Sequence, residues 1–213
     1  MFGKKKVAMA AAEFLGAYAL ASAVFAMASR TPFPFFGAAA AGVTLAVMVL
    51  VIGSVSGSHI NPAVTFGLWT VRKVPGRQAV VFVAAQMLGG FVALRTNQYL
   101  ANQVFANSAA VNWDWRVVAA ETIGTFVFTF GIAAAVYKGY EGTQLAATIG
   151  ASLFVGVLLA SFGAAGVLNP AVALGVNSWS ASYVVAPFAG ALVGMQTYAL
   201  LFAPEKAAAK KRG

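Results

Sequence analysis

The chain alternates between long apolar segments and short polar connections. Six apolar segments lie at 7–28, 36–55, 78–94, 117–137, 143–162 and 182–202. A bilayer core about 30 Å thick requires about 20 apolar residues in a helix, so each segment predicts one membrane-spanning helix. The segments are continuous and do not alternate apolar with polar residues, which favours helices over the strands of a barrel.

Composition supports a membrane protein with no soluble domain. The chain is 61% hydrophobic and 9% charged over 213 residues, whereas soluble domains carry about 25% charged residues. The first apolar segment is too long for a signal peptide, so we expect it to be retained as a span. There is no cysteine, which excludes disulfides, thiolate metal sites and cysteine nucleophiles. We expect one transmembrane domain over residues 1–213, without a cofactor or metal.

The basic residues follow a membrane topology. If both termini are cytoplasmic, only Arg30, Arg95 and Arg116 of the 14 lysines and arginines fall on the outer side. This distribution obeys the positive-inside rule and agrees with an even number of spans. We therefore predict a multi-pass protein of the cell or plasma membrane with both termini in the cytoplasm. The net charge of +9 then requires no nucleic-acid partner.

The sequence contains an internal repeat at an offset of 108 residues. Asn61-Pro62-Ala63 maps onto Asn169-Pro170-Ala171, and several glycines and leucines match at the same offset without a gap. Each half, about 1–106 and about 107–213, contains three spans. Because three is odd, the second half enters the membrane from the opposite side, which makes the repeat inverted. Repeats of this kind place a site near the membrane midplane, between the halves.

Each Asn-Pro-Ala motif begins a short helix, at 62–70 and at 170–178. Nine helical residues rise about 13.5 Å, which is about half of the bilayer core. Asn61 and Asn169 occupy the N-cap and a proline follows at the first helical position, a favoured helix start. We predict two re-entrant half-helices that meet by their N-termini beside a polar lumen. With the side-chain oxygens used for capping, the NH₂ groups are left free as donors.

These motifs resemble those of the major intrinsic protein family, the aquaporins and aquaglyceroporins. The resemblance is carried by the run SGSHINPAVT from Ser56 to Thr65 and by the second motif after Leu168, and it extends from Glu13 to Phe202. It implies an all-α membrane fold with six transmembrane helices and two re-entrant half-helices. It also implies a homotetramer with one pore per subunit. The implied function is passive conduction of water and small uncharged solutes, not catalysis.

Two glutamates and one histidine lie within the predicted membrane region. Glu13 and Glu121 are related by the 108-residue offset, and a carboxylate in a span is costly unless it is hydrogen-bonded or paired. A proton relay or a catalytic acid pair is one interpretation, but symmetric duplication favours a structural task, and the resemblance implies that they brace the re-entrant loops. His59 has no repeat partner, because Val167 is its equivalent. On the pore approach it is either a pH sensor or a neutral, hydrogen-bonded histidine.

The predicted outer constriction departs from the family pattern. The family commonly places an aromatic residue, a histidine and an arginine there. The corresponding positions hold Ala41, Val157, Gly166 and, in place of the arginine, Val172. Two outcomes compete. Small side chains leave a mouth wide enough for glycerol-sized solutes, or an apolar ring loses its water and reduces the flow of solute. We expect the wide mouth and weak discrimination among small neutral solutes.

Other functions are compatible with the same sequence. One is a facilitator of glycerol, urea or ammonia with little water specificity. A second is an inverted-repeat transporter that couples a solute to ions. A third is a structural membrane protein on this fold, because fold does not determine function. An intramembrane enzyme has the least support, since no nucleophile and base lie at a plausible spacing.

Overall fold

The computed structural model describes residues 3–28, 34–109 and 111–204. Within them the chain forms eight helices and no strand. Six are long and apolar enough to cross a membrane, which confirms the predicted all-α fold with six spans. The long helices are α1 (Lys4–Ala28), α2 (Pro34–Ser56), α4 (Gly76–Ala101), α5 (Trp115–Lys138), α6 (Gly142–Ala160) and α8 (Ala181–Leu201); the short ones are α3 (Pro62–Thr70) and α7 (Pro170–Gly175).

The helix α4 extends further than the apolar pattern predicts. The apolar segment ends at residue 94, yet the helix continues to Ala101 and includes Arg95. Arg95 Nη1 donates to Gln98 Oε1 at 3.3 Å, and Asn102 ends the helix in the left-handed conformation with φ of 49°. Polar residues suit a helical turn that projects beyond the bilayer core. Arg30 and the basic residues after 204 lie outside the described residues.

The second short helix is shorter than predicted. It ends at Gly175 instead of residue 178, because Asn177 adopts a positive φ of 53°. Asn tolerates this left-handed conformation better than most residues. Its side-chain Nδ2 donates to the carbonyl oxygen of Phe105 at 2.7 Å, which fixes the turn against the long loop between α4 and α5.

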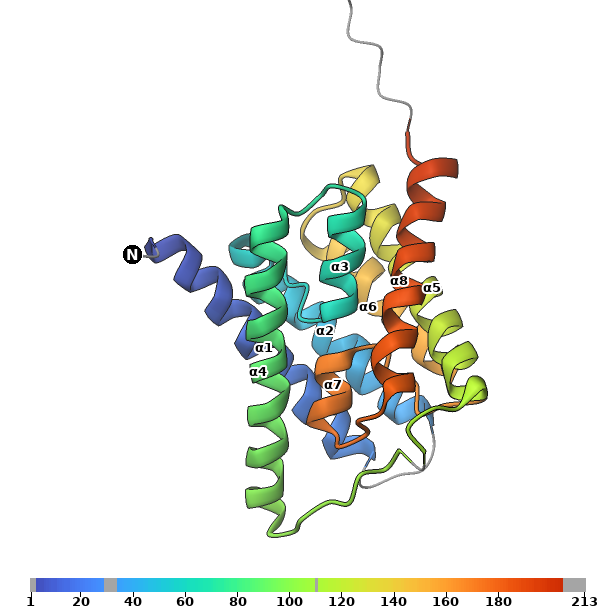
Figure 1. Cartoon of the computed structure of the whole chain (residues 1–213). Helices are drawn as coiled ribbons and strands as arrows, with labels where there is room; N and C mark the ends of the chain where they lie inside the picture. Colours follow the sequence, from blue (N-terminus) through green and yellow to red (C-terminus); the bar gives the residue numbers. More distant parts are fainter. Residues whose placement is uncertain (1–2, 29–33, 110, 205–213) are drawn as a thin grey trace, which may run out of the picture.

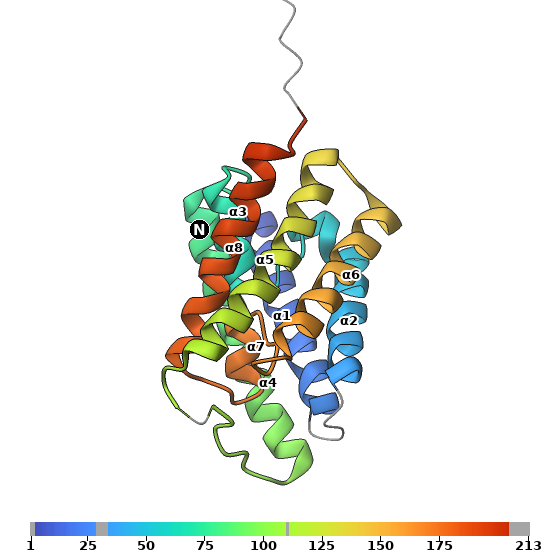
Figure 2. The ribbon, with the colours of Figure 1, turned by 90° about the vertical axis from the view of Figure 1, so that its right-hand side faces the viewer.

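The two short helices lie in opposite halves of the molecule. In both Figure 1 and Figure 2, α3 is in the upper half and α7 in the lower half. Each packs against long helices of the other half as well as its own: α3 contacts α8 and α4, and α7 contacts α4, α1 and α8. The helices α2 and α6 cross at Gly42 and Gly150, where a Cβ on either glycine would lie within 2.7 Å of the other's carbonyl oxygen. Glycine is therefore required for this close approach.

Candidate functional site

The two Asn-Pro-Ala motifs start the short helices. Asn61 precedes α3, and its Oδ1 accepts a hydrogen bond from the amide of Ala63 at 2.8 Å. Asn169 precedes α7, and its Oδ1 accepts from the amides of Ala171 at 2.9 Å and Val172 at 3.3 Å. Both asparagines have an extended backbone, and the side chain of each caps its helix by accepting from amides that lack an acceptor within the helix. The chain thus turns from loop to helix at each motif.

Each asparagine also binds the loop of the other half. Asn61 Nδ2 donates to the carbonyl oxygen of Leu168 at 2.9 Å, and Asn169 Nδ2 donates to that of Ile60 at 3.0 Å. The prediction that both NH₂ groups are free is therefore wrong for one hydrogen of each group, which is donated to the opposite loop. Because an amide carries two donor hydrogens, one remains on each asparagine, and both side chains line a cavity.

The residue before each asparagine has an uncommon backbone conformation. Ile60 has φ of 42° and Leu168 has φ of 53°, a region that is strained for side chains of this size, most of all for a β-branched one. The amide of Ile60 donates to Glu13 Oε2 at 2.7 Å, and that of Leu168 donates to Glu121 Oε2 at 2.7 Å. Glu13 and Glu121 are both fully buried. Each carboxylate thus holds one re-entrant loop in its strained conformation.

A network of polar side chains surrounds the first loop. Gln86 Nε2 donates to Glu13 Oε2 at 2.6 Å and to Thr65 Oγ1 at 2.9 Å. Thr65 Oγ1 also lies 3.2 Å from His59 Nδ1, and Ser56 Oγ donates to Glu13 Oε1 at 2.6 Å. Neither Gln86 nor Thr65 was among the predicted site residues, although a glutamine inside an apolar span is a signal that could have identified the first. Across the described residues, no three His, Asp or Glu side chains gather into a group that could hold a metal.

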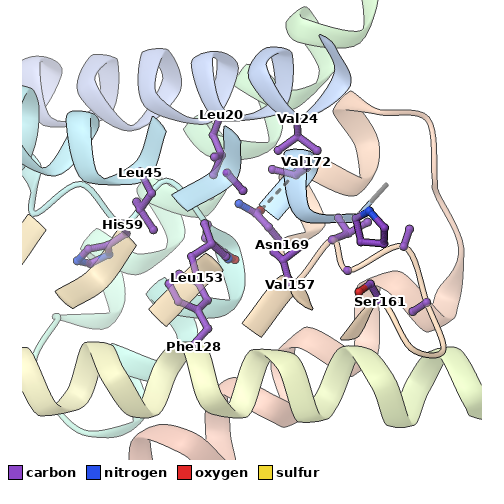
Figure 3. A pocket seen from close by; sticks show the side chains of 18 residues that line it. Leu20, Val24, Leu45, His59, Phe128, Leu153, Val157, Ser161, Asn169 and Val172 are labelled. Carbon is purple, nitrogen blue, oxygen red and sulfur yellow. Dashed lines mark hydrogen bonds between the residues drawn. The ribbon is translucent and has the colours of Figure 1, made fainter. Parts of the chain in front are cut away.

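The four positions of the predicted constriction line one cavity of about 370 Å³ together with both asparagines. We call it the outer cavity, after the predicted orientation. Figure 3 shows Val157, Val172 and Ser161 toward one end of it and His59, Leu45 and Phe128 toward the other, with Asn169 between them. Apart from His59, its lining among the described residues has no titratable side chain; Ala41 and Gly166 complete the ring with Val157 and Val172.

A second cavity of about 260 Å³ lies on the other side of His59. We call it the inner cavity. It shares three lining residues with the outer cavity, namely Leu45, His59 and Phe128. Lys73 also lines it, with the ammonium nitrogen 4.3 Å from the centroid of the Tyr137 ring. The two cavities therefore adjoin at these three side chains.

Leu45 and Phe128 were not among the predicted site residues. The 108-residue offset relates Leu20 to Phe128 and Leu45 to Leu153, and all four residues line the outer cavity. Their apolar character hid them, since an apolar residue in a span is more often packed in the core or exposed to lipid.

Comparison with known proteins identifies the family. Residues 4–198 match the family model described as "Major intrinsic protein". Aquaporin AqpM of Methanothermobacter thermautotrophicus is 33% identical over 183 residues, covering 75% of this chain and 74% of the relative. Aquaporin NIP1-1 of Arabidopsis thaliana is 31% identical over 212 residues, covering 88% of this chain and 71% of the relative.

A solved structure has the same fold. The X-ray structure of the aquaglyceroporin from Plasmodium falciparum matches with a TM-score of 0.71 and 23% identity, covering 92% of this chain and 96% of the other. The six apolar helices, the matched family model and the aquaporin relatives agree with one another. The chain belongs to the major intrinsic protein family, and it is an integral membrane channel of the aquaporin type and not an enzyme.

Proposed function

We propose that this channel conducts water and other small uncharged solutes passively, with weak discrimination among them. The outer cavity carries the proposal: its volume is about 370 Å³, and it is ringed by Ala41, Val157, Gly166 and Val172. Val172 stands where the family resemblance implies an arginine, so no guanidinium narrows the passage or offers donors. A wide, uncharged mouth suits solutes of glycerol size as well as water.

The two asparagines provide the donors that a passing oxygen atom meets. Each amide has one hydrogen bonded to the opposite loop and one hydrogen left. A water oxygen that accepts from both points its own hydrogens away on both sides, which interrupts a hydrogen-bonded proton chain. The six residues of α7 contribute a weaker helix dipole than the nine of α3, because fewer peptide units are aligned. Proton exclusion therefore rests chiefly on the asparagines and on α3.

Solute size is selected further inward, at the three residues that separate the two cavities. Phe128 is 1% exposed and is among the largest fully buried side chains of the described residues. Together with Leu45 and His59 it belongs to both cavities. A solute that enters the wide outer mouth must pass this group to reach the inner cavity. In this proposal Phe128 limits the size of the solute, while the imidazole of His59 offers a polar contact.

Lys73 contributes to the exclusion of cations. Its side chain lines the inner cavity, and the outer ring of Ala41, Val157, Gly166 and Val172 has no positive charge. A cation approaching the inner mouth meets an ammonium group before it reaches the asparagines, so Coulomb repulsion raises its barrier to entry. Neutral solutes are not affected by this charge.

Glu13 and Glu121 act as braces and not as ion carriers. Both oxygens of each carboxylate accept hydrogen bonds from a re-entrant loop. A coupling site in a transporter must release its ion during each cycle, and that would free the strained loop residues. The bonding pattern therefore supports a channel in preference to an ion-coupled transporter. The same proposal includes a homotetramer with one pore per subunit, which the family resemblance implies. It also includes cytoplasmic termini, which the distribution of basic residues implies.

Stopped-flow light scattering on liposomes containing the protein tests the proposal, with water, glycerol, urea and ammonia as permeants. We expect all four to enter faster than in protein-free liposomes. Rapid water entry with exclusion of the other three would overturn weak discrimination. Slow entry of all four would favour an apolar ring that dewets. Gradient-driven accumulation of a solute would identify a transporter instead, because a channel cannot concentrate its solute.

A further inference from the structure

A third cavity, of about 500 Å³, lies away from the pore at the start of two long helices. It shares no lining residue with the outer or inner cavity. The starts of α1 and α4 lie in the upper half of Figures 1 and 2, the half that also contains α3. We call it the basic cavity; its lining consists of Lys6, Met9, Pro75, Arg77, Gln78, Val81 and Phe82.

The basic cavity has two positive charges without a carboxylate to balance them. Lys6 comes from the first turns of α1 and Arg77 from the first turn of α4, and both residues are exposed. Neither forms an ion pair within the described residues. The four carboxylate side chains of the described residues either hold the re-entrant loops or lie at the starts of α5 and α6. They are Glu13, Glu121, Asp114 and Glu141.

The backbone at the start of α4 adds donors to the same place. Pro75 is the N-cap and has no side-chain oxygen to cap the helix. The first amide bonded within the helix is that of Ala79, which donates to the carbonyl of Pro75 at 3.0 Å. The amides of the first turn, at residues 76–78, therefore lack an acceptor within the 26-residue helix. Free amides and the positive helix end attract an anion, which reinforces Lys6 and Arg77.

The other walls of the cavity are apolar. Met9, Val81 and Phe82 line it beside the two cations. On the same helices, Val7 is 56% and Val80 is 71% exposed, so the apolar surface continues outward along α1 and α4. A free phosphate would neutralise the cations but leave this apolar surface uncovered. An amphiphile with an anionic head and hydrocarbon chains covers both.

We propose that the basic cavity binds an anionic phospholipid. Lys6, Arg77 and the first amides of α4 bind the phosphate of the headgroup, and an acyl chain lies along Met9 and Val81. The position fits, since the ends of membrane-spanning helices lie at the depth of the headgroups. A zwitterionic lipid would bring its own cation to two uncompensated positive charges. The site therefore selects lipids with a net negative charge.

A pair of double variants tests the site against general surface charge. Lys6→Gln with Arg77→Gln removes both cations of the cavity. Lys4→Gln with Lys5→Gln removes two exposed cations from the same end of α1, but neither lysine lines the cavity. The two variants have equal net charge. Phe82 is left unchanged, because its ring meets that of His59 edge-on at 5.3 Å and a change there would reach the pore.

The measurement is native mass spectrometry of the full chain with phosphatidylglycerol or phosphatidylcholine of identical acyl chains. We expect the original protein and Lys4→Gln with Lys5→Gln to retain phosphatidylglycerol in preference to phosphatidylcholine. Lys6→Gln with Arg77→Gln removes the two cations proposed to contact the headgroup. At about 1 kcal/mol for each, this variant should bind phosphatidylglycerol about 30-fold more weakly. Circular dichroism and gel filtration check the folding of each variant, and Arg77→Gln compared with Lys5→Gln replaces the doubles if one of them misfolds.

Three results would overturn the proposal. An equal loss of phosphatidylglycerol in both variants would show that the binding reflects surface charge alone. Equal retention of the two lipids by the original protein would show that it reflects hydrophobic contact alone. Displacement of the lipid by millimolar inorganic phosphate would make the site one for free anions. Solute flux is not measured in this experiment, so its outcome is independent of the proposed conduction.

Discussion

The two halves of the chain hold their re-entrant loops with the same backbone geometry and with different side chains. Glu13 accepts from two loop amides and also from Ser56 Oγ and Gln86 Nε2, both at 2.6 Å. Glu121 accepts from two loop amides, at 2.9 and 2.7 Å, and from no side chain of the described residues. The carboxylate and the strained loop are thus duplicated, whereas the polar side chains around them belong to the first half.

The 108-residue offset shows where the difference arises. Each polar residue of the first network maps onto an apolar residue or glycine in the second half. The re-entrant loop can therefore be held by amide donors and one carboxylate, and the remaining side chains are free to differ between the two halves. The pairs are Ser56 and Ala164, His59 and Val167, Thr65 and Ala173, and Gln86 and Gly194.

The largest expected effect is a loss of stability that differs between the Glu13→Gln and Glu121→Gln variants. A glutamine accepts through one oxygen, so the donors that face its NH₂ group lose their acceptor. Glu13→Gln affects two of four donors and Glu121→Gln one of two. At about 1–3 kcal/mol for each buried donor left unsatisfied, the free energy of unfolding should fall by about 2–6 and about 1–3 kcal/mol respectively. Unfolding in mixed detergent micelles measures both.

The variant Gln86→Leu serves as a control for this comparison, because it removes one donor of Glu13 without changing its charge. It should cost less than Glu13→Gln and leave Glu121 unaffected. Equal losses for the two glutamate variants would show that the first network adds nothing to the second arrangement. A stable Glu13→Gln protein with altered proton coupling would favour an ion-coupled transporter.

The next effect concerns the asparagine of the second half. Asn169→Leu removes the donor to Ile60, the cap of α7 and the donor left for solute. Losing one hydrogen bond to the permeating molecule costs about 1.4 kcal/mol in the barrier, so water permeability should fall about tenfold or more. Stopped-flow water flux, normalised to the amount of protein inserted, measures this.

Asn169→Asp is the matched variant, because it keeps the acceptor for the cap and replaces the donor by a second acceptor. If donation matters, Asn169→Asp should lose flux as Asn169→Leu does while keeping more of its stability. Near-normal flux in a well-inserted Asn169→Leu protein would remove this residue from the conduction path.

The fold and the motifs could be predicted from the sequence, while the place of Phe128 between the two cavities could not. Apolar runs of membrane length and a gap-free repeat depend on local pattern alone, so six spans and the half-helix start at Pro62 followed directly. The early end of α7 depends on Asn177 binding a distant loop carbonyl, which no local pattern contains. Phe128 acquires its place through the packing of α5 against α6 and α8, and an apolar residue in a span does not reveal which neighbour it meets.

A third prediction restores the charge that the outer mouth lacks. Val172→Arg places a guanidinium in the outer cavity, where it fills volume and adds donors. The rates of glycerol and urea entry should fall about tenfold, because the free-energy barrier to entry rises by about 1.4 kcal/mol. The rate of water entry should fall less. Val64 is the repeat equivalent of Val172 and lines the inner cavity, so Val64→Arg tests whether the effect belongs to the outer ring. A wider permeant range in Val172→Arg would contradict the proposed wide mouth.

The smallest expected effect tests where solute size is selected. Phe128→Leu shortens the side chain that both cavities share, so glycerol should pass about three times faster, a barrier lower by about 0.7 kcal/mol. Water, being smaller, should gain less. The measurement is the ratio of glycerol to water permeability in the same liposomes, which cancels differences in protein content.

Leu20→Ala is the matched control for Phe128→Leu, since Leu20 is the repeat equivalent of Phe128 and lines the outer cavity but not the inner one. Both substitutions remove buried apolar volume, and each should cost stability through the space it leaves. If size is selected at Leu45, His59 and Phe128, Leu20→Ala enlarges a cavity that is already wide and leaves the permeability ratio unchanged. An equal rise in both variants would place the resistance in the outer cavity and return selection to the ring of Ala41, Val157, Gly166 and Val172.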